Sequence, residues 1–522
     1  MPVRGIKDNE RKPWWERYLA VTDRLSRAFL GRTSKLLPLA HFRSTLAGKG
    51  TAMPAMRRRA ASHGEGEPRG RLSPFVFSAL LSLSIGSLLF AQAPGAAPGR
   101  TPPADAVVAR LREAARTDPL AWERLSYLCD RIGPRLAGTA PFLQAVRWAE
   151  GTSRQDGLDG VHLEPVTLEV WVRGRERAVM TAPVLHELPM LGLGESVGTP
   201  GVEAPVVMVR SLEEVGPQVK GKIVLFNPVI APEASGGARY GIYSPLRTHG
   251  PSRAAAAGAV AALIRTAPLT SLATPHTGTL EYDLDAPKIP AATIPMEYAE
   301  WIGRLVSAGV EVRVRLEMDA HSVGNVATAN VVAEVRGISA PDEIVLIGAH
   351  LDSWDVGQGA QDDGVGVIHV IEAMRLIHAL GVAPQRSIRA VLFANEEHGL
   401  DGGKAYAAAH GAERHLAAVE SDAGSGPPLE WTASGTPQQL AWFTTASRAT
   451  GLALRHGGGG ADMSPLARAG VLTAELRVDQ PRYFDVHHTE ADTLDKVDPQ
   501  ALRDDVAALA TLAWQLANAP AP

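Results

Sequence analysis

The pattern of apolar and polar positions changes three times along the chain. Between about Pro103 and Trp148, apolar residues recur at three- and four-residue spacing, which predicts helices. From Val161 to about Arg315, short β-rich runs alternate with Gly/Pro loops around one Ala-rich helix, SRAAAAGAVAAL. Beyond Asn325, apolar strand-like runs alternate regularly with helical segments. The sequence therefore predicts a helical start, a β-rich middle and an α/β region.

The regular alternation in the last region predicts the fold class. Strands that alternate with helices form an α/β fold with a mainly parallel or mixed sheet and helices on both faces. We expect four segments: a leader over 1–100, the N-terminal helical part of the main domain over 104–160, a β-rich insertion over 161–320 and the rest of the main domain over 325–519.

The leader carries an export pattern. An arginine-rich stretch over 57–71 precedes an apolar run, Pro74–Phe90, and the sequence AQA follows. This order is typical of a secretory signal and predicts a secreted or periplasmic protein that begins near Pro94. An uncleaved membrane anchor that holds the protein outside the cytoplasm is the alternative, although the run is at the short limit for a bilayer span. Because signals rarely begin so far inside a chain, Met53 or Met56 is a candidate start.

Composition and charge exclude several partners. Of 522 residues, 45% are hydrophobic and 21% charged, as in soluble globular proteins. The net charge of -4 offers no general attraction for nucleic acid or an anionic membrane. Cys129 is the single cysteine, so a disulfide within the chain is excluded and a zinc site must use histidines and carboxylates.

Polar clusters follow the predicted strands of the last region. The clusters are His350 with Asp352, Asp362 with Asp363, Glu396 with Glu397, Asp422, and His487 with His488. Taken alone, each is more often a loop residue, a helix cap or a solvated pair. In α/β sheets, however, functional residues gather beyond the carboxyl ends of the strands. Two histidines and several carboxylates without cysteine suit a catalytic zinc site.

Four of these segments carry a family resemblance. HLDSWDVGQGAQDDGVG, NEEHG, ESDAG and HHTEADT resemble the co-catalytic zinc exopeptidases of metallopeptidase family twenty-eight, and within it the carboxypeptidase Q group of dipeptidases. The likeness extends upstream through ERLSYLCDRIGPRLAGT, so it covers nearly everything after residue 104.

The resemblance implies a role for each matching residue. It implies two zinc ions, a general base, a carboxylate that orients one histidine, and a cis peptide after the residue that bridges both metals. The implied ligands are His350, Asp362 and Asp422 for one zinc and Asp362, Glu397 and His488 for the other, with Glu396 as general base and Asp352 as the orienting residue. His487 is the second choice for His488.

The implied activity is hydrolysis of short peptides or dipeptides by a hydroxide that bridges the metals. A di-zinc amidohydrolase acting on N-acyl amino acids, such as a deacylase or glutaminyl cyclase, is one alternative, and a receptor-like relative without catalysis is another. The expected partners are short peptides, with a homodimer left open.

Two further features concern the surroundings of the site. The β-rich insertion resembles a protease-associated domain in the order of GKIVLF, AAAAGAVAALI and AATIPM, which implies a lid or a partner surface. Tyr483 and Phe484, just before the histidine pair, either line the substrate pocket or pack in the core. His369, His378 and His398 are expected to be packing or surface residues.

Overall fold

The computed structural model describes residues 104–268 and 272–521. The leader with its predicted signal and start sites lies outside the described residues. The described residues belong to one compact unit, Pro94–Pro522. Among the helices that are described, none combines the length and the apolar character that a membrane crossing requires.

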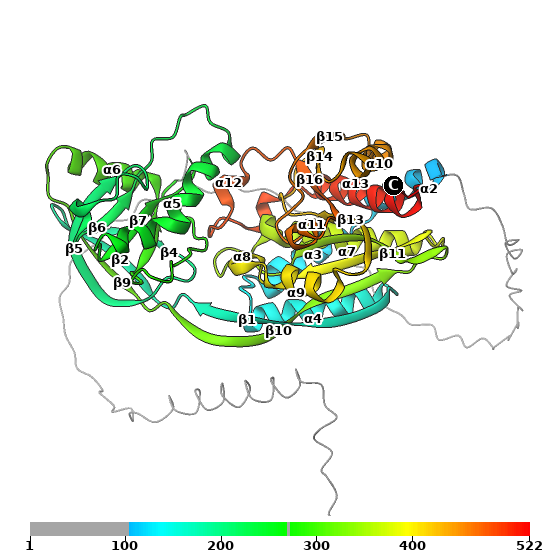
Figure 1. Ribbon diagram of the computed structural model, residues 1–522, viewed down its shortest axis with the longest axis horizontal. Helices are drawn as coiled ribbons and strands as arrows, with labels where there is room; N and C mark the ends of the chain where they lie inside the picture. Colours follow the sequence, from blue (N-terminus) through cyan, green and yellow to red (C-terminus); the bar gives the residue numbers. More distant parts are fainter. Residues whose placement is uncertain (1–103, 269–271, 522) are drawn as a thin grey trace, which may run out of the picture. The chain divides into compact units, whose positions relative to one another are not determined.

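Eight strands form the main sheet, in the order β1-β10-β12-β11-β13-β16-β14-β15 (Figure 1). In chain order they are β1 (Asp159–Val172), β10 (His321–Val335), β11 (Ala340–His350), β12 (Arg386–Phe393), β13 (Arg414–Glu420), β14 (Pro428–Ser434), β15 (Ala453–His456) and β16 (Leu472–Val478). The central strands β12, β11, β13 and β16 are parallel, whereas β1, β10 and β14 add antiparallel pairs. The sheet is mixed, which confirms the predicted fold class.

Helices cover both faces of this sheet. They are α2 (Ala104–Thr117), α3 (Leu120–Tyr127), α4 (Ala140–Gln155), α7 (Val365–Ala379), α8 (Glu396–Gly399), α9 (Asp401–His410), α10 (Pro437–Ser447), α11 (Ser464–Arg468), α12 (Tyr483–Val486) and α13 (Pro499–Asn518), with short turns η2 (Leu128–Ile132), η4 (Ala360–Gly364), η5 (Arg448–Thr450) and η6 (Leu494–Lys496). Helix α13 begins where the Asp498 side chain accepts hydrogen bonds from the Gln500 and Ala501 amides, with Pro499 in the first turn.

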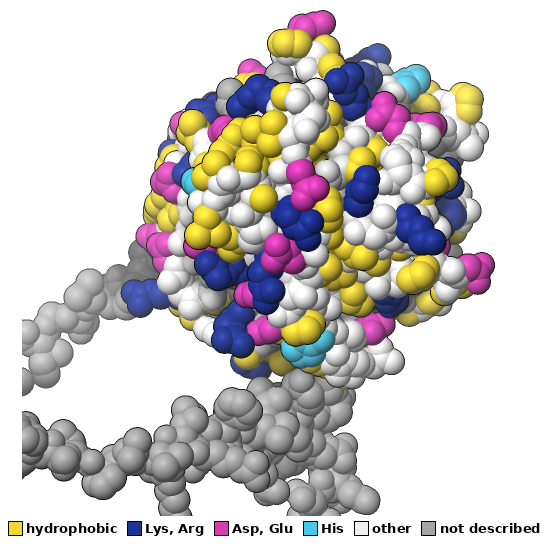
Figure 2. Space-filling model, turned by 90° about the vertical axis from the view of Figure 1, so that its left-hand side faces the viewer, with side chains coloured by type: hydrophobic (Ala, Val, Ile, Leu, Met, Phe, Trp, Pro, Cys, Tyr) yellow, Lys and Arg dark blue, Asp and Glu magenta, His cyan; other side chains and the backbone are white. Residues whose placement is uncertain are grey.

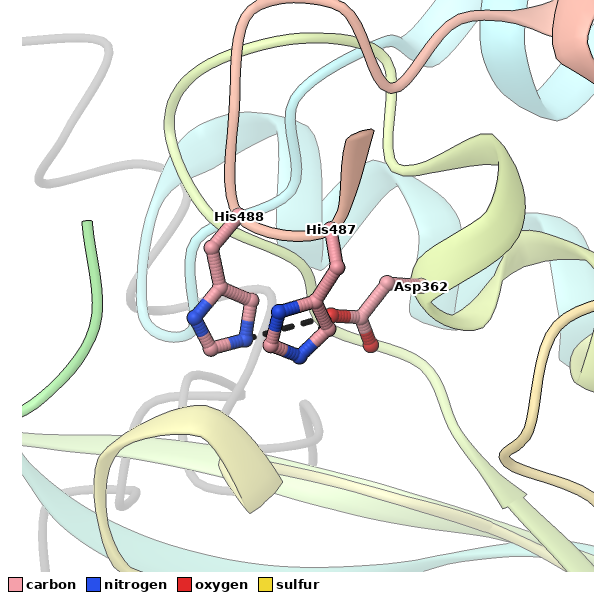
Figure 3. Close-up of side chains that lie close together, drawn as sticks. All are labelled: Asp362, His487 and His488. Atoms are coloured by element: carbon pink, nitrogen blue, oxygen red, sulfur yellow. Dashed lines mark ion pairs between the residues drawn. The ribbon is translucent and has the colours of Figure 1, made fainter. Parts of the chain in front are cut away.

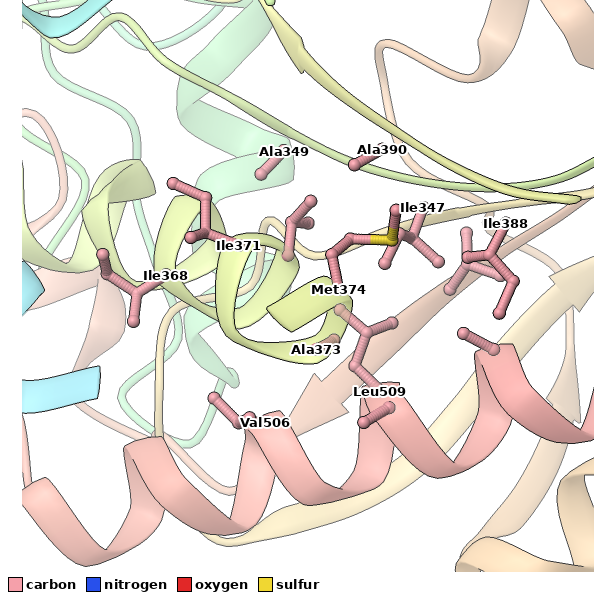
Figure 4. Packing of buried hydrophobic residues seen from close by; sticks show 14 of the residues in the cluster. Ile347, Ala349, Ile368, Ile371, Ala373, Met374, Ile388, Ala390, Val506 and Leu509 are labelled. Carbon is pink, nitrogen blue, oxygen red and sulfur yellow. The ribbon is translucent and has the colours of Figure 1, made fainter. Parts of the chain in front are cut away.

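Side chains of the central strands alternate between two apolar clusters, as the two-residue period of a strand requires. On one face, Ile347 and Ile388 pack with Ile371 and Met374 of α7 and Leu509 of α13 (Figure 4). This cluster is the larger one and fixes the strands whose carboxyl ends carry the predicted site.

The neighbouring strand positions point to the opposite face. Leu346 and Phe393 pack there with Tyr406 of α9 and Leu466 of α11. Because β11 is buried on both sides, its sequence is a continuous apolar run rather than an alternating one.

A second sheet has the strand order β3-β2-β9-β5-β6-β7-β8-β4. Its strands are β2 (Glu176–Ala182), β3 (His186–Leu188), β4 (Leu191–Gly192), β5 (Thr199–Val209), β6 (Ile223–Phe226), β7 (Ala261–Arg265), β8 (Ala291–Ile294) and β9 (Arg313–Met318), and its helices are α5 (Gly236–Ala256), α6 (Met296–Ser307) and the turn η3 (Pro217–Val219). On the outer face at this end of the protein, basic, acidic and apolar side chains are interspersed (Figure 2).

Two details differ from the sequence-based expectations. Strand β1 pairs with β10 from Asp159 to Val172, so these residues belong to the main sheet and the second sheet starts at Glu176 rather than at residue 161. The Ala-rich helix ends at Ala256, and the apolar residues after it form the buried strand β7. Gly258, at φ +89°, separates the helix from the strand.

Candidate metal centre

The predicted site residues come together at the carboxyl-terminal edge of the main sheet. His350 is the last residue of β11, and Asp422 follows β13, its neighbour in the sheet. The Glu396–Glu397 pair follows β12 on the other side of β11. Asp362 lies in η4 directly before α7, and His488 follows α12. Parallel strands thus deliver these side chains to one place, as expected for an α/β sheet.

One group of ligand atoms surrounds His350. The His350 Nε2 atom lies 3.2 Å from Asp362 Oδ1 and 3.4 Å from Asp422 Oδ1. The His350 side chain is fully buried. Its Nε2 atom therefore points at two carboxylates rather than at water.

A second group surrounds His488. The His488 Nε2 atom lies 3.2 Å from Asp362 Oδ2 (Figure 3). It also lies 3.0 Å from Glu397 Oε2. Asp362 is shared, because its Oδ1 faces the first group and its Oδ2 faces the second. This is the arrangement that a carboxylate bridging two metal ions requires.

The donor set fits zinc. Four-coordinate zinc, with bonds of about 2.0–2.1 Å, separates neighbouring ligand atoms by roughly 3.3 Å. The distances in the two groups run from 3.0 to 3.4 Å. In addition, His350 Nε2, Asp362 Oδ2 and Glu397 Oε1 are buried without a hydrogen-bond partner among the described residues. Buried polar atoms are normally paired, and an ion bound at this place would satisfy these atoms.

The distances between ligand atoms alone also allow other sets of candidate metal ligands. Ligand atoms within 4.8 Å of one another occur in the sets Asp362, His487, His488 and His350, Asp363, Asp422. The Asp363 oxygens, however, accept hydrogen bonds from the backbone amides of His350 and Gly366, at 3.1 Å each. Because Asp363 already binds two amides, Asp362 is the better candidate for a shared ligand.

His487 is the nearest rival of His488. Its ring stacks on the His488 ring with centroids 3.5 Å apart, and its Nε2 atom lies 3.3 Å from Asp362 Oδ2 (Figure 3). Only His488 is also close to Glu397, at 3.0 Å. His488 therefore reaches two carboxylates of the second group, and His487 reaches one.

Asp352 lies where it can position both the histidine and the glutamate pair. Its backbone oxygen is 3.1 Å from His350 Nδ1, closer than its carboxylate at 3.8 Å. The Asp352 carboxylate instead accepts from the backbone amides of Glu396, at 3.2 Å, and Glu397, at 3.4 Å. The orienting contact expected from its carboxylate is thus made by its carbonyl, and the carboxylate holds the turn that carries both glutamates.

The two glutamates differ in their surroundings. Glu397 is buried beside His488, whereas Glu396 is half-buried, and both line the cavity at the site. Burial raises the pKa of the Glu396 carboxyl well above its ordinary value; His350 opposes this effect, while Asp422 and Glu397 add to it. Burial and Asp362 raise the pKa of the Glu397 carboxyl as well, so the direction of the shift does not distinguish the two glutamates.

Asp492 holds the backbone at the shared ligand Asp362, and no role was assigned to it from the sequence. Its carboxylate accepts from the backbone amides of Gln361, at 2.7 Å, and Asp362, at 3.1 Å. The peptide between Asp362 and Asp363 is cis, as the resemblance implied. The position of Asp492 within HHTEADT was visible in the sequence, but its contact with Asp362 depends on the fold.

A loop between β7 and β8 of the second sheet contacts the site directly, in addition to the role as a lid or partner surface that was expected of this region. The backbone amide of Thr277 donates to the His488 carbonyl at 2.9 Å, and the Thr279 hydroxyl donates to the Glu397 carbonyl at 2.6 Å. The loop around Gly278 therefore binds the backbone of two of the candidate ligands.

A cavity of about 340 Å³ opens onto the candidate ligands. Its lining includes Glu396, the predicted pocket residues Tyr483 and Phe484, and Tyr240 and Arg247 from α5. An adjoining cavity shares Arg247, Thr279 and both glutamates with it. Ligand sites in proteins typically begin at about 300 Å³, so the space suits a small substrate.

Two of the other histidines, His369 and His398, have partners of their own. His369 is fully buried in α7 and lies 2.8 Å from the Ser421 hydroxyl, and His398 packs on Trp354 and lies 3.1 Å from Glu195. Both make structural contacts, in agreement with their expected packing role.

Comparison with known proteins gives a consistent result. Residues 330–513 match the family described as Peptidase family M28. Carboxypeptidase Q from Homo sapiens is 38% identical over 412 residues, which cover 76% of this chain and 85% of that protein. Carboxypeptidase Q from Bos taurus is 37% identical over 409 residues with the same coverage.

Solved structures show the same relationship. A peptidase M28 precursor from Shewanella amazonensis is 38% identical, has a TM-score of 0.77, and covers 80% of this chain and 99% of its own. An aminopeptidase from Aneurinibacillus shares the fold, with a TM-score of 0.58 at 22% identity, covering 79% of this chain and 97% of its own. Taken together with the histidine and carboxylate groups, these likenesses mean that the chain belongs to peptidase family M28 and is a zinc metallopeptidase similar to carboxypeptidase Q.

Proposed function

We propose that this protein is an exported di-zinc exopeptidase that hydrolyses short peptides, including dipeptides. The main support for two metal ions is the position of Asp362. One of its carboxylate oxygens faces the His350 group and the other faces the His488 group. The carboxypeptidase name of the curated relatives supports action at a chain end. The order of basic, apolar and A-x-A segments in the leader supports export.

In this proposal the two groups hold one zinc each. His350, Asp362 and Asp422 would bind the first ion, and Asp362, Glu397 and His488 the second. Bound zinc lowers the pKa of water to about 7 and polarises a carbonyl oxygen, which is the chemistry that peptide hydrolysis needs at neutral pH. We also assign the peptidase domain to residues 104–172 and 321–519, with the second sheet as an insertion that closes one side of the cleft.

In this proposal the residues around the two ions have separate roles as general base, metal ligand and positioning residues. Glu396, which lines the cleft, takes a proton from the attacking water and returns it to the amine of the leaving fragment. Glu397 is a ligand, and Asp352 fixes the turn that carries both glutamates by accepting from their backbone amides. Asp492 fixes Asp362 between the two groups.

The proposal is tested against its nearest alternative by substrate choice. We expect the purified, zinc-loaded protein to hydrolyse free dipeptides and to lose this activity on chelation of zinc. N-acetyl amino acids serve as the matched probe for an amidohydrolase. Faster hydrolysis of the N-acetyl amino acids would replace the peptidase proposal with the amidohydrolase one, and zinc binding without hydrolysis of either would favour a receptor-like role.

Substitution of each neighbouring histidine separates the ligand from its rival. Because His488 reaches both Asp362 and Glu397, His488→Gln should lower the zinc content from about two to about one per chain. His487→Gln, the matched control in the same stacked pair, should keep both ions, because its Nε2 atom meets Asp362 alone. Metal analysis of the two variants is the measurement. Loss of zinc from His487→Gln with retention in His488→Gln would reverse the assignment.

A further inference from the structure

Arg247 is a cation at the candidate site that has no anionic partner. It lies in α5, is 8% exposed, and lines both cavities that meet at the glutamate pair. Its Nε and Nη1 atoms are buried without a hydrogen-bond partner, and no ion pair joins it to a carboxylate of the described residues. A buried charge without a partner is costly, so such a residue calls for an explanation.

The protein builds a defined place for this guanidinium. The rings of Tyr240 and Tyr243 lie 5.8 and 5.7 Å from its central carbon, within cation–π range. On another side it lies against the backbone of Gly278, where a Cβ atom would come within 1.4 Å of Arg247 Nη1. Gly278 also has φ +138°, which favours glycine. Arg247 is therefore fitted into a slot rather than left at the surface.

The slot is connected to the candidate ligands. Gly278 lies between Thr277 and Thr279, whose hydrogen bonds reach the His488 and Glu397 carbonyls. The Tyr240 ring lies 5.2 Å from the His487 ring. The carboxylate that acts electrostatically on Arg247 is that of Glu397. In the proposed enzyme Glu397 binds zinc, so its charge is already offset.

The other arginine of the cavity is different. Arg477 is 3.1 Å from the Glu475 carboxylate, and its side chain is 41% exposed. The charge of Arg477 is therefore paired with a carboxylate of the protein. The charge of Arg247 has no such partner within the described part of the chain and is available to an anionic group of a ligand. A peptide carries one such group at a fixed place, its terminal carboxylate, and guanidinium binds carboxylates through paired, charge-assisted hydrogen bonds.

We infer that Arg247 binds the free α-carboxylate of the peptide substrate, and that this contact selects peptides cleaved close to their carboxyl end. The inference rests on the proposed function and adds a specificity-determining residue to it. Arg247 acts on the substrate directly and takes no part in holding zinc. Its removal should therefore affect recognition of the carboxylate and leave the metal content unchanged.

The test compares two substrates that differ in one group, alanyl-leucine and alanyl-leucine amide. For the wild type, kcat/KM for the free acid should exceed that for the amide by about 10- to 100-fold, the usual effect of a hydrogen bond to a charged group. Arg247→Met should lose this preference, mainly through a higher KM for the acid, with the amide unaffected. Arg247→Lys should restore part of it, because the charge returns without the paired geometry.

The control is Arg477→Met, which removes the paired cation of the same cavity and should keep the preference for the acid. Zinc content and thermal melting confirm that each variant is folded and loaded; since Met replaces an unpaired buried charge, Arg247→Met should fold. Retention of the acid preference in Arg247→Met, or its loss in Arg477→Met instead, would overturn the inference.

A binding measurement separates this inference from the proposed function. If the zinc-loaded wild type hydrolyses neither peptide, the proposed function fails, and calorimetry with the same two peptides still tests Arg247. Tighter binding of the acid than of the amide, lost in Arg247→Met, supports the carboxylate site. Equal binding of the acid by wild type and Arg247→Met overturns it.

Discussion

Glu396→Gln should lower kcat by about 10²–10⁴-fold while the zinc content stays at the wild-type level, because general acid–base catalysis contributes rate enhancements of this size. The amide keeps the shape of the side chain but cannot accept the proton of the attacking water. Glu396 lines the cleft, and the carboxylate that lies 3.0 Å from His488 belongs to Glu397. Steady-state kinetics and metal analysis of the same preparation check both parts of this prediction.

Glu397→Gln is the matched control, since it makes the same chemical change one residue away. It should weaken one zinc, so that activity and metal content fall together and excess zinc restores part of the activity. If Glu396→Gln sheds zinc while Glu397→Gln retains it, the two roles are exchanged. If both variants stay fully active, the catalytic site lies elsewhere.

Asp362→Asn should be the most damaging substitution at the metal centre. Asp362 meets His350 through Oδ1 and His488 through Oδ2, so a single change removes a negative charge from both groups. We expect zinc to fall below about one ion per chain and peptide hydrolysis to fall by more than the ~10²–10⁴-fold expected for loss of the base. Asp422→Asn is the control, because Asp422 belongs to the first group alone and should cost about one ion. Equal zinc loss in the two variants would contradict the shared role of Asp362.

The α/β class of the main sheet was readable from the sequence because its central strands are buried on both faces. Such strands are continuous apolar runs, and the polar residues that follow them stand out at the strand ends. His350 at the end of β11 and the glutamate pair after β12 were located in this way. Their assignment as ligand and base came from the family resemblance, because spacing alone does not distinguish Glu396 from Glu397.

The sequence did not show which sheet the residues of β1 join, or where helix α5 ends. The residues of β1 have the same β-rich texture as those of the second sheet, and only the pairing with β10 places them in the main sheet. The Ala-rich segment favours a helix by propensity, but β7 lies between β6 and β8 as a fully buried strand. Tertiary packing decides such short apolar runs, which periodicity cannot assign.

The role of Arg247 could not be predicted from the sequence for a different reason. An arginine in a helix is ordinarily exposed, so its sequence position indicated no function. Its burial depends on Gly278 and on two tyrosines of its own helix, and its unpaired state depends on where every nearby carboxylate lies. Asp492 is a similar case, because the amides that it binds belong to a loop far away in the sequence.

Anomalous diffraction at the zinc edge, from crystals of the zinc-loaded protein, tests the central claim most directly. The account predicts two peaks about 3.5–4 Å apart on either side of the Asp362 carboxylate, as in two-metal hydrolytic sites. One peak should contact His350 and Asp422, and the other Glu397 and His488. A single peak, or peaks that are held by other residues and leave Asp362 uncoordinated, would contradict the account.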